Sequence, residues 1–363
     1  MISSSISSTL STIELLQISW FLLIGSLLAV YAVLDGFDLG VGIVHLVNSN
    51  DKDRHRNFKL ITPFWDGNEV WLLTAGGALF AAFPNAYATI FSAFYLPFMF
   101  LIFSLIFRAI SMEFRDKFEN KGSKYFLKWK KLFDYSFAYS SMLVSFLFGV
   151  AIANIIRGLP LDNNGNYIAD IFFMLNPYSM LVGITVVLMF ATHGALYLCF
   201  RNDHESDSNL DYVKIAVKNR ILAGWLWIPF NIFYFLSAMI TILYYQREHK
   251  WISLLFFALS ILFMFLNKFY NYKKKDLLAF LFSSLTIIFA FLLVLSTLFP
   301  YFVPNFVSNV AITTNSITIY NSSSSKNTLA IMLLLAFIGM PLVIAYTTYI
   351  YKTFIFKKNS LKI

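Results

Sequence analysis

Long apolar runs follow one another along most of the chain, with polar and charged residues gathered between them. Nine segments have this apolar character. They are approximately 15–46, 63–83, 86–110, 132–156, 178–200, 218–244, 251–267, 277–300 and 329–351. The run AFLFSSLTIIFAFLLVLSTLF alone exceeds the roughly 18 apolar residues that are typical of a transmembrane helix. Because an open-ended element in lipid must satisfy its own backbone hydrogen bonds, all nine segments are predicted to be helical.

The composition supports a membrane protein. The chain has 363 residues, of which 58% are hydrophobic and 13% are charged, whereas a soluble domain has about 25% charged residues. The predicted fold class is an all-α polytopic membrane protein, a bundle of eight to nine transmembrane helices. We expect a first helical bundle over residues 1–160, which holds the acidic motifs, and a second over residues 161–363. The single cysteine, Cys199, excludes an intramolecular disulfide and a cysteine-cluster metal site.

Lysine and arginine are concentrated in alternate connections. The segments 47–62, 111–131, 201–220, 268–276 and the C-terminal tail hold 23 of the 28. If all nine segments cross, these connections share one side of the membrane, and the positive-inside rule makes that side cytoplasmic. The N-terminus is then outside and the C-terminus inside. The net charge of +9 is explained by these basic connections and does not indicate nucleic-acid binding. Segment 63–83 is the weakest of the nine predicted spans.

Two pairs of acidic residues lie within the apolar segments. YAVLDGFDLGVG places Asp35 and Asp38 deep in the first segment, and FWDGNEVW places Asp66 and Glu69 at the start of the second. Each pair has i, i+3 spacing and therefore lies along one helix face. A carboxylate at membrane depth is costly and normally faces a bundle interior, a cavity or a partner. The alternative is that these acids cap helices or pair with basic residues near the interface.

The positions of the acids suggest a path from the cytoplasm. Asp38 lies about eight residues before the cytoplasmic end of its segment, and Asp66 about three residues after the start of the next. At a rise of ~1.5 Å per residue, their depths are neighbouring but different. The glycines around both motifs allow the two helices to approach closely. Such depths are what steps on a path inward from the cytoplasm would have.

Arg108 and His193 each have two interpretations. Arg108, near the cytoplasmic end of the third segment, either extends to the interface or forms a salt bridge with an acid or an anionic group. His193 lies well inside a span, where it is either a buried, hydrogen-bonded side chain or, with His45, half of a haem ligand pair. The two histidines lie at poorly matched depths, so the sequence favours a chain with no redox metal of its own.

The chain resembles subunit II of the cytochrome bd-type quinol oxidases. YAVLDGFDLGVG and FWDGNEVWLLTAGGALFAAFP are similar to the signature segments of that family. The resemblance continues, in order, in SLIFRAISMEFR, FGVAIANIIRGLP, FMLNPY, ATHGALYL, FSSLTIIFA, FPYFVPN and SITIYNSSSS. It covers nearly the whole chain.

This resemblance implies a function in a larger complex. Subunit II pairs with a haem-bearing subunit I, often with a small single-helix accessory subunit, in the bacterial cytoplasmic membrane. The complex oxidises quinol and reduces dioxygen to water, and it builds proton-motive force without pumping. Haems b and d are expected on subunit I, with none bound by this chain alone. Some members hold a quinone or lipid in a groove of this subunit, and the resemblance leaves that open here.

The resemblance also implies roles for individual residues. Asp66 is the first candidate for proton delivery, together with Asp38 and Glu69. Trp65, Asp35 and Arg108 are expected to support that path. The chain departs from the family at two motif positions, with Phe64 where members often have histidine and Glu69 where many have glutamine. The family is usually described with eight spans, which again puts segment 63–83 in question.

Two other functions fit some of these features. Acids near glycine breaks are also typical of proton- or cation-coupled transporters. A transporter, however, would have a matching broken helix in the second half, and nothing there resembles DGFD or WDGN. The third interpretation is a structural membrane scaffold, in which the acids have no part in turnover.

Overall fold

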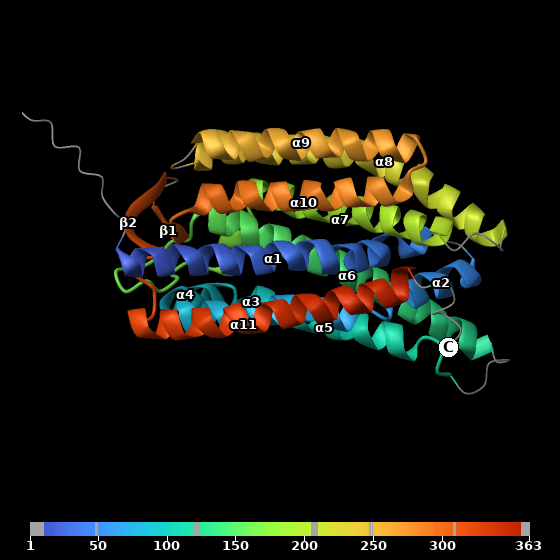
Figure 1. Cartoon of the computed structure of the whole chain (residues 1–363), viewed down its shortest axis with the longest axis horizontal. Coiled ribbons are helices and arrows are strands. Elements are labelled where there is room, and N and C mark those ends of the chain that lie inside the picture. Colours follow the sequence, from blue (N-terminus) through green and yellow to red (C-terminus); the bar gives the residue numbers. More distant parts are fainter. Residues whose placement is uncertain are drawn as a thin grey trace, which may run out of the picture.

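The protein is an elongated bundle of parallel and antiparallel helices (Figure 1). The computed structural model describes residues 11–47, 50–118, 124–204, 210–246, 248, 250–307 and 310–356. The helical elements are α1 (Thr12–Val44), η1 (His45–Val47), α2 (Asp51–Ile61), α3 (Trp65–Ala82), α4 (Pro84–Ala93), α5 (Tyr95–Phe114), α6 (Lys124–Arg157), η2 (Ile171–Met174), α7 (Pro177–His204), α8 (Leu210–Ile240), η4 (Thr241–Tyr245), α9 (Lys250–Tyr272), α10 (Asp276–Leu298), α11 (Lys326–Tyr351) and η5 (Lys352–Phe356). Eight helices in these ranges are long and apolar enough to cross a membrane. The predicted all-helical, polytopic fold class is confirmed.

Helix α3 is not among those eight, but it runs through the same depth as α1. Asn68 near its start donates a hydrogen bond to Asp38 of α1, whereas Ala82 at its end packs in one cluster with Trp20 of α1. The two helices are therefore antiparallel. The 18 residues of α3 extend over about 27 Å at 1.5 Å per residue. With α3, the described part of the chain traverses the bundle nine times, and α11 ends opposite the start of α1 (Figure 1).

The predicted segment 86–110 is two helices instead of one. A turn at Phe94 separates α4 from α5. Pro97 lies in the first turn of α5, where its missing N–H needs no partner. In a continuous helix, the same proline would deprive the carbonyl of Ala93 of its hydrogen bond. The break therefore follows from Pro97, which the count of apolar residues does not detect.

Helices α1 and α7 cross at the centre of the bundle in very close contact. A Cβ atom added to Gly40 would lie 1.9 Å from the backbone oxygen of Phe190 and 2.7 Å from the backbone nitrogen of Gly194. Only glycine allows this approach, as in other membrane helix pairs with small residues at the crossing. The crossing buries the C-terminal half of α1, including both of its aspartates.

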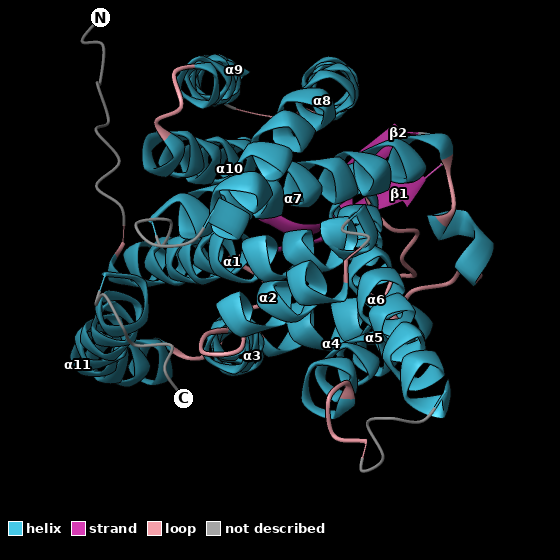
Figure 2. Ribbon diagram, turned by 90° about the vertical axis from the view of Figure 1, so that its right-hand side faces the viewer, coloured by secondary structure: helices cyan, strands magenta, loops and turns pink. Residues whose placement is uncertain are grey.

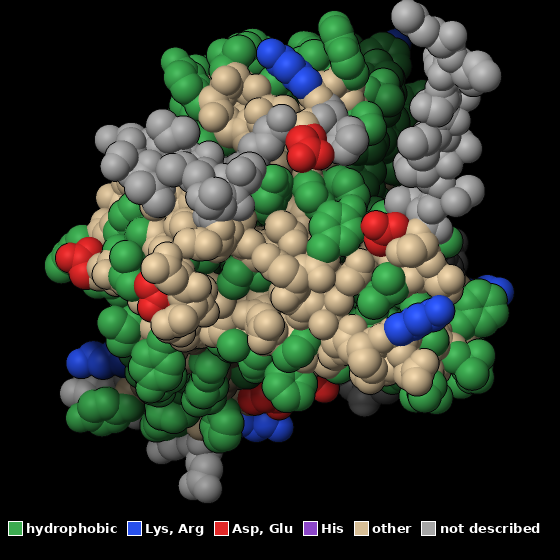
Figure 3. Space-filling model, turned by 90° about the vertical axis from the view of Figure 1, so that its left-hand side faces the viewer, with side chains coloured by type: hydrophobic (Ala, Val, Ile, Leu, Met, Phe, Trp, Pro, Cys, Tyr) green, Lys and Arg blue, Asp and Glu red, His purple; other side chains and the backbone are tan. Residues whose placement is uncertain are grey.

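The two ends of the bundle differ in composition and structure. At one end lie α2 and the described parts of the connections that the sequence marks as basic (Figure 1). At the other end, β1 (Tyr301–Val307) and β2 (Val310–Thr318) form an antiparallel hairpin that the apolar pattern did not predict. Few charged side chains appear among the described residues of this second end (Figure 3). The described parts of the basic connections thus share one end, as the sequence predicts.

The sides of the bundle also differ. Helices α3, α5 and α11 lie along one side, and α8 and α9 along the opposite side (Figure 2). Helix α11 is the least buried span, with 6% of its most apolar window inside the structure. The predicted division into residues 1–160 and 161–363 stays a prediction. One core cluster combines Phe37 and Phe137 of the first range with Leu196 and Ala279 of the second.

Candidate functional site

Arg108 is the centre of a buried cluster of acids from three helices. Helix α5 turns Arg108 to the same buried side as Leu101 and Ser104, and its side chain has no exposed surface. Its Nη2 donates to Oδ1 of Asp35 at 2.8 Å, and its Nη1 donates to Oε1 of Glu69 at 2.7 Å. The guanidinium therefore joins α1, α3 and α5. Of the two predicted roles for Arg108, the salt bridge is confirmed.

Both carboxylate oxygens of Asp35 accept hydrogen bonds in this cluster. The hydroxyl of Tyr31, one turn earlier on α1, donates to Oδ2 at 2.8 Å. Asp35 is fully buried, whereas the side chain of Glu69 is 23% exposed. Charge-assisted hydrogen bonds of this kind stabilise an ionised carboxylate. Glu69 is thus the member of the ion-pair cluster that reaches the surface of this chain.

Asp38 belongs to a second, adjoining set of contacts. The side-chain amide of Asn68 donates to Oδ2 of Asp38 at 2.6 Å and to the carbonyl of Leu34 at 3.3 Å. The hydroxyl of Tyr351, at the end of α11, donates to Oδ1 of Asn68 at 2.8 Å. Asp38 is fully buried. Its Oδ1 atom has no hydrogen-bond partner among the described residues.

Asp66 and Trp65 lie outside these contacts. Asp66 is exposed on α3, and the structure gives it no hydrogen bond or ion pair within the described ranges. Trp65 is partly buried at the first residue of the same helix. Since Asp66 precedes Glu69 by three residues, the two lie close together along α3. The structure thus brings Asp35, Asp38, Glu69 and Arg108 together and leaves Asp66 at the surface beside them.

His193 is a buried and satisfied histidine, as the first of its two interpretations predicts. Its Nδ1 lies 2.8 Å from the hydroxyl oxygen of Ser283, and its Nε2 lies 3.2 Å from the carbonyl oxygen of Val33. The ring also stacks on Phe280. Both nitrogens of His193 are therefore engaged in the fold.

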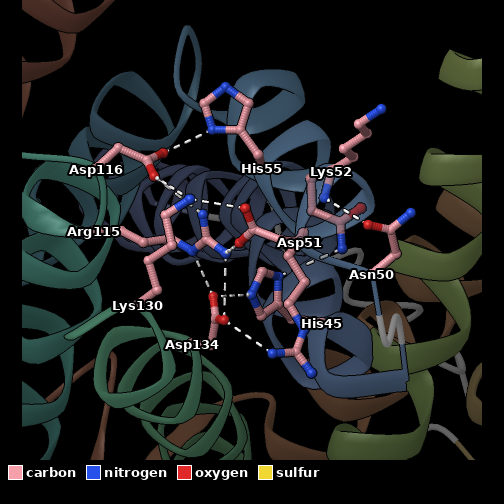
Figure 4. A network of polar contacts seen from close by, with 11 residues as sticks. His45, Asn50, Asp51, Lys52, His55, Arg115, Asp116, Lys130 and Asp134 are labelled. Atoms are coloured by element: carbon pink, nitrogen blue, oxygen red, sulfur yellow. Dashed lines mark hydrogen bonds and ion pairs between the residues drawn. The ribbon is translucent and has the colours of Figure 1, made fainter. Parts of the chain in front are cut away.

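A second network of charged side chains, which the sequence did not reveal, lies at the basic end of the bundle (Figure 4). Asp134 of α6 is its buried centre. It accepts hydrogen bonds from Nε of Arg115 at 2.6 Å and from Nη1 of Arg54 at 3.0 Å, and its Oδ1 lies 2.9 Å from Nε2 of His45. Arg115 also donates to Asp51 at 2.6 Å. The network therefore connects η1 and α2 with α6 and with the residues that follow α5.

Two surface acids extend the same network. Oδ2 of Asp116 lies 2.7 Å from Nδ1 of His55 (Figure 4), and this hydrogen bond holds the pKa of Asp116 well below its usual range. Partial burial by itself would raise the pKa of Asp51, but hydrogen bonds from Lys130 and Arg115 lower it overall. The ionised acids hold α2 in place, and α2 leads directly into the start of α3. The network thus helps to position Asn68 and Glu69.

A cavity of about 520 Å³ lies beside the acid cluster. Its lining residues come from α1 and from the end of α11. They are Leu34, Thr347, Thr348, Tyr351 and Lys352. Two of them, Leu34 and Tyr351, are the residues that hold the amide of Asn68. The cavity is therefore linked to Asp38 through Asn68, and Lys352 contributes its positive charge to the lining.

Sequence analysis missed several residues of the site. Tyr31 is four residues before Asp35 and would follow from helical spacing, and Asn68 stands inside the FWDGNEVW motif. Tyr351 and Asp134 reach the site only through tertiary contacts, at sequence separations of 283 and 89 residues from Asn68 and His45. No local pattern marks them.

Comparison with known proteins gives a consistent result over nearly the full length. The family model described as cytochrome bd terminal oxidase subunit II matches residues 16–354. Cytochrome bd ubiquinol oxidase subunit 2 of Bacillus subtilis (strain 168) is 31% identical over 341 residues, which cover 94% of this chain and 95% of that protein. Cytochrome bd-I ubiquinol oxidase subunit 2 of Escherichia coli (strain K12) is 39% identical over 193 residues, 52% of this chain and 49% of that protein.

The fold is likewise similar to a solved structure. A chain in the structure of bd oxidase from Geobacillus thermodenitrificans matches with a TM-score of 0.73 at 17% sequence identity. The match covers 95% of this chain and 100% of that chain. At this identity, the match supports the fold and not individual residue roles.

Proposed function

This chain belongs to the cytochrome bd terminal oxidase subunit II family, and from that premise we propose that it delivers protons from the cytoplasm to the haem-bearing subunit of the complex. It is a multi-pass membrane subunit of a quinol:oxygen oxidoreductase. Family membership removes the transporter interpretation. The structural scaffold remains the rival against which proton delivery is tested.

The observation that carries this proposal is the buried acid cluster. Three carboxyl groups and one guanidinium share the interior between α1, α3 and α5, where a purely structural subunit would need none. Ionisable groups inside a membrane protein mark ion or proton pathways. Glu69 reaches the surface of the chain one helical turn from Asp66. Protons would therefore enter or leave the cluster on the exposed face of α3.

We assign the side formed by α3, α5 and α11 to the contact with the haem-bearing subunit. Added Cβ atoms at Gly67, Gly76, Gly77 of α3 and at Gly339 of α11 would meet nothing of this chain within 4 Å. Small residues without a neighbour in their own chain allow another helix to approach closely. The same side carries Asp66, whose charge is costly against lipid but not against a polar partner surface.

Replacing Gly77 by leucine tests this contact. An added Cβ atom there meets nothing of this chain within 4 Å and the position is exposed, so the subunit should still fold, but leucine would displace a closely packed partner helix. We expect the haem-to-protein ratio of the purified complex to fall. Ala258→Leu, an equally small and exposed position on α9 of the opposite side, is the matched control. Equal haem ratios in both variants would place the contact elsewhere.

Replacing Asp66 by asparagine tests proton delivery. The variant keeps the shape of the side chain and removes its ability to carry a proton. We expect oxygen consumption with quinol to fall by on the order of 10²-fold, the lower end for the loss of a positioned acid–base group. Haem content should be unchanged. Asp211→Asn, an exposed acid near the start of α8, is the control that should keep the full rate.

An assembled Asp66→Asn complex that turns over at the wild-type rate would leave the scaffold interpretation as the correct one. A complex that loses haem would instead indicate that Asp66 acts in assembly. Measuring haem content and turnover on the same preparation therefore separates the two roles.

The histidines within the spans support haem binding by the partner. His193 has both nitrogens engaged, and His45 contacts Asp134 through Nε2 and Asn57 through Nδ1. Neither fits a haem iron without breaking contacts of the fold. We therefore assign haems b and d to subunit I.

The remaining assignments follow from topology and from the cavity. We place the basic end, with η1 and α2, in the cytoplasm, because it gathers the basic connections. The atoms exposed in the cavity between α1 and α11 are mostly apolar, and Lys352 adds a positive charge to its lining. This combination suits a lipid or quinone. A small single-helix accessory subunit completes the proposed complex, which draws on the membrane quinol pool.

A further inference from the structure

We propose that Asp38 is a neutral carboxylic acid in the resting protein, with its proton on Oδ1, and that Asn68 and Tyr351 position it. The protonation state is inferred from contacts and charge. Its use in proton transfer rests on the proposed function. Asp35 and Glu69 then form a fixed ion-pair set with Arg108, and Asp38 is the acid that holds the transferable proton.

The two oxygens of Asp38 have different surroundings. Oδ2 accepts the hydrogen bond from Asn68 at 2.6 Å, whereas Oδ1 is buried with no partner among the described residues. The amide of Asn68 cannot turn over to change this, because Tyr351 donates to its oxygen and the carbonyl of Leu34 accepts from its nitrogen. A bare carboxylate oxygen in such a site is far more costly than a neutral O–H that lacks one acceptor.

The charges around Asp38 favour the same state. The charged or titratable groups that face it are Asp35 on α1, Glu69 on α3, Arg108 on α5 and Tyr351 on α11. Arg108 is already shared between Asp35 and Glu69. With all three acids ionised, the cluster would hold two uncompensated negative charges. With Asp38 protonated, one remains, and partly exposed Glu69 can place it near solvent or a partner.

Tyr351 and Asn68 act as positioning residues. The Tyr351 ring packs against Phe64, with ring centroids 4.7 Å apart, and its hydroxyl fixes the orientation of Asn68. Asn68 donates to Oδ2 of Asp38, which leaves Oδ1 as the oxygen that carries the proton. In transfer, the Oδ1–H bond breaks and the proton passes to a water molecule. That water becomes a hydronium ion, and a second hydronium ion then returns a proton to Oδ1 and is left as water, so that no electrons are exchanged.

Infrared spectroscopy of the purified, haem-loaded complex tests the proposal directly. We expect a carbonyl stretching band of a protonated carboxylic acid that shifts in D₂O and disappears in Asp38→Asn. The band should persist in Asp211→Asn, which makes the same change from acid to amide at an exposed aspartate. If the Asp38→Asn spectrum differs from the wild-type spectrum only by the loss of carboxylate bands, the inference is overturned.

The outcomes separate this inference from the proposed function. A band lost in Asp38→Asn with turnover unchanged supports the protonated acid and contradicts proton delivery through it. Slow turnover without a protonated band contradicts the resting state proposed here and leaves proton delivery standing.

Tyr351→Phe gives a second measurement if Asp38→Asn does not assemble. Loss of the hydroxyl frees the orientation of Asn68, so the Asp38 carbonyl band should shift or broaden without disappearing. Tyr349→Phe, at a side chain that is 66% exposed on the same helix, is the matched control and should leave the band unchanged. A Tyr351→Phe spectrum identical to that of Tyr349→Phe would contradict the positioning role.

Discussion

Replacing Gly40 by alanine should prevent the chain from reaching its folded, assembled state. The added methyl group would lie 1.9 Å from the backbone oxygen of Phe190, and 2.7 Å and 2.8 Å from the nitrogen and Cα of Gly194. None of these atoms belongs to a flexible side chain, so α1 and α7 must move apart. Overpacking typically costs about 1–3 kcal/mol, and a clash with backbone at the central crossing should reach or exceed the upper limit.

The measurement is the yield and melting temperature of the haem-containing complex. Gly224→Ala is the matched control, because its Cβ would lie 3.4 Å from Nζ of Lys268 and 3.8 Å from Nδ2 of Asn271, both ordinary contacts with side-chain ends. Gly194→Ala should be as harmful as Gly40→Ala, since its Cβ would lie 2.2 Å from the carbonyl carbon of Gly40. If the Gly40→Ala and Gly224→Ala complexes have the same melting temperature, α1 and α7 do not cross as closely as described.

The helical framework could be predicted from the sequence because each span must be apolar over its own length. Hydrophobic runs predicted the long helices, and the lysine and arginine content predicted which connections lie at the same end of the bundle. Helix α3 shows the limit of this approach. Its first five residues include Asp66 and Glu69, so its apolar character alone cannot establish that it spans the bundle. Its course became clear only from tertiary contacts with α1 at Asn68 and Ala82.

The site could be predicted in part, for the same physical reason. A buried acid is unusual within a helix, so Asp35 and Asp38 are visible locally, and Arg108 is visible as a buried base. Which acid pairs with Arg108 depends on how α1, α3 and α5 rotate against one another. That rotation places Asp35 and Glu69 against the guanidinium and leaves Asp66 exposed. Tyr351 approaches from the last helix and has no local signal at all.

The two charged networks have different consequences for function. The network around Asp134 lies at the basic end, and its contacts with α6, η1 and Arg115 hold α2 against the bundle. The cluster around Arg108 lies deeper and has more acid than base. An excess of acid is unnecessary for anchoring, but it is what a proton-holding site requires. The deeper cluster is therefore the better candidate for chemistry.

Replacing Arg108 by methionine should destabilise the protein by about 3–5 kcal/mol, the typical cost of removing one partner from a buried ion pair. Methionine is unbranched and flexible, so it fills most of the space and limits the cavity. Asp35, with no exposed surface, would keep only the hydrogen bond from Tyr31. We expect a lower melting temperature of the purified complex and a smaller yield. Lys326→Met, at an exposed position at the start of α11, is the control for loss of a positive charge.

The melting temperature of a triple variant shows whether electrostatics or packing causes the loss of stability in Arg108→Met. If uncompensated acid causes the loss, adding Asp35→Asn and Glu69→Gln to Arg108→Met should recover most of the melting temperature, because neutral replacements of a complete buried ion set are often tolerated. If the loss comes from packing, the triple variant should be no more stable than Arg108→Met. Recovery would mean that Arg108 is present to keep the two acids ionised. The stability of the fold does not by itself require such an arrangement.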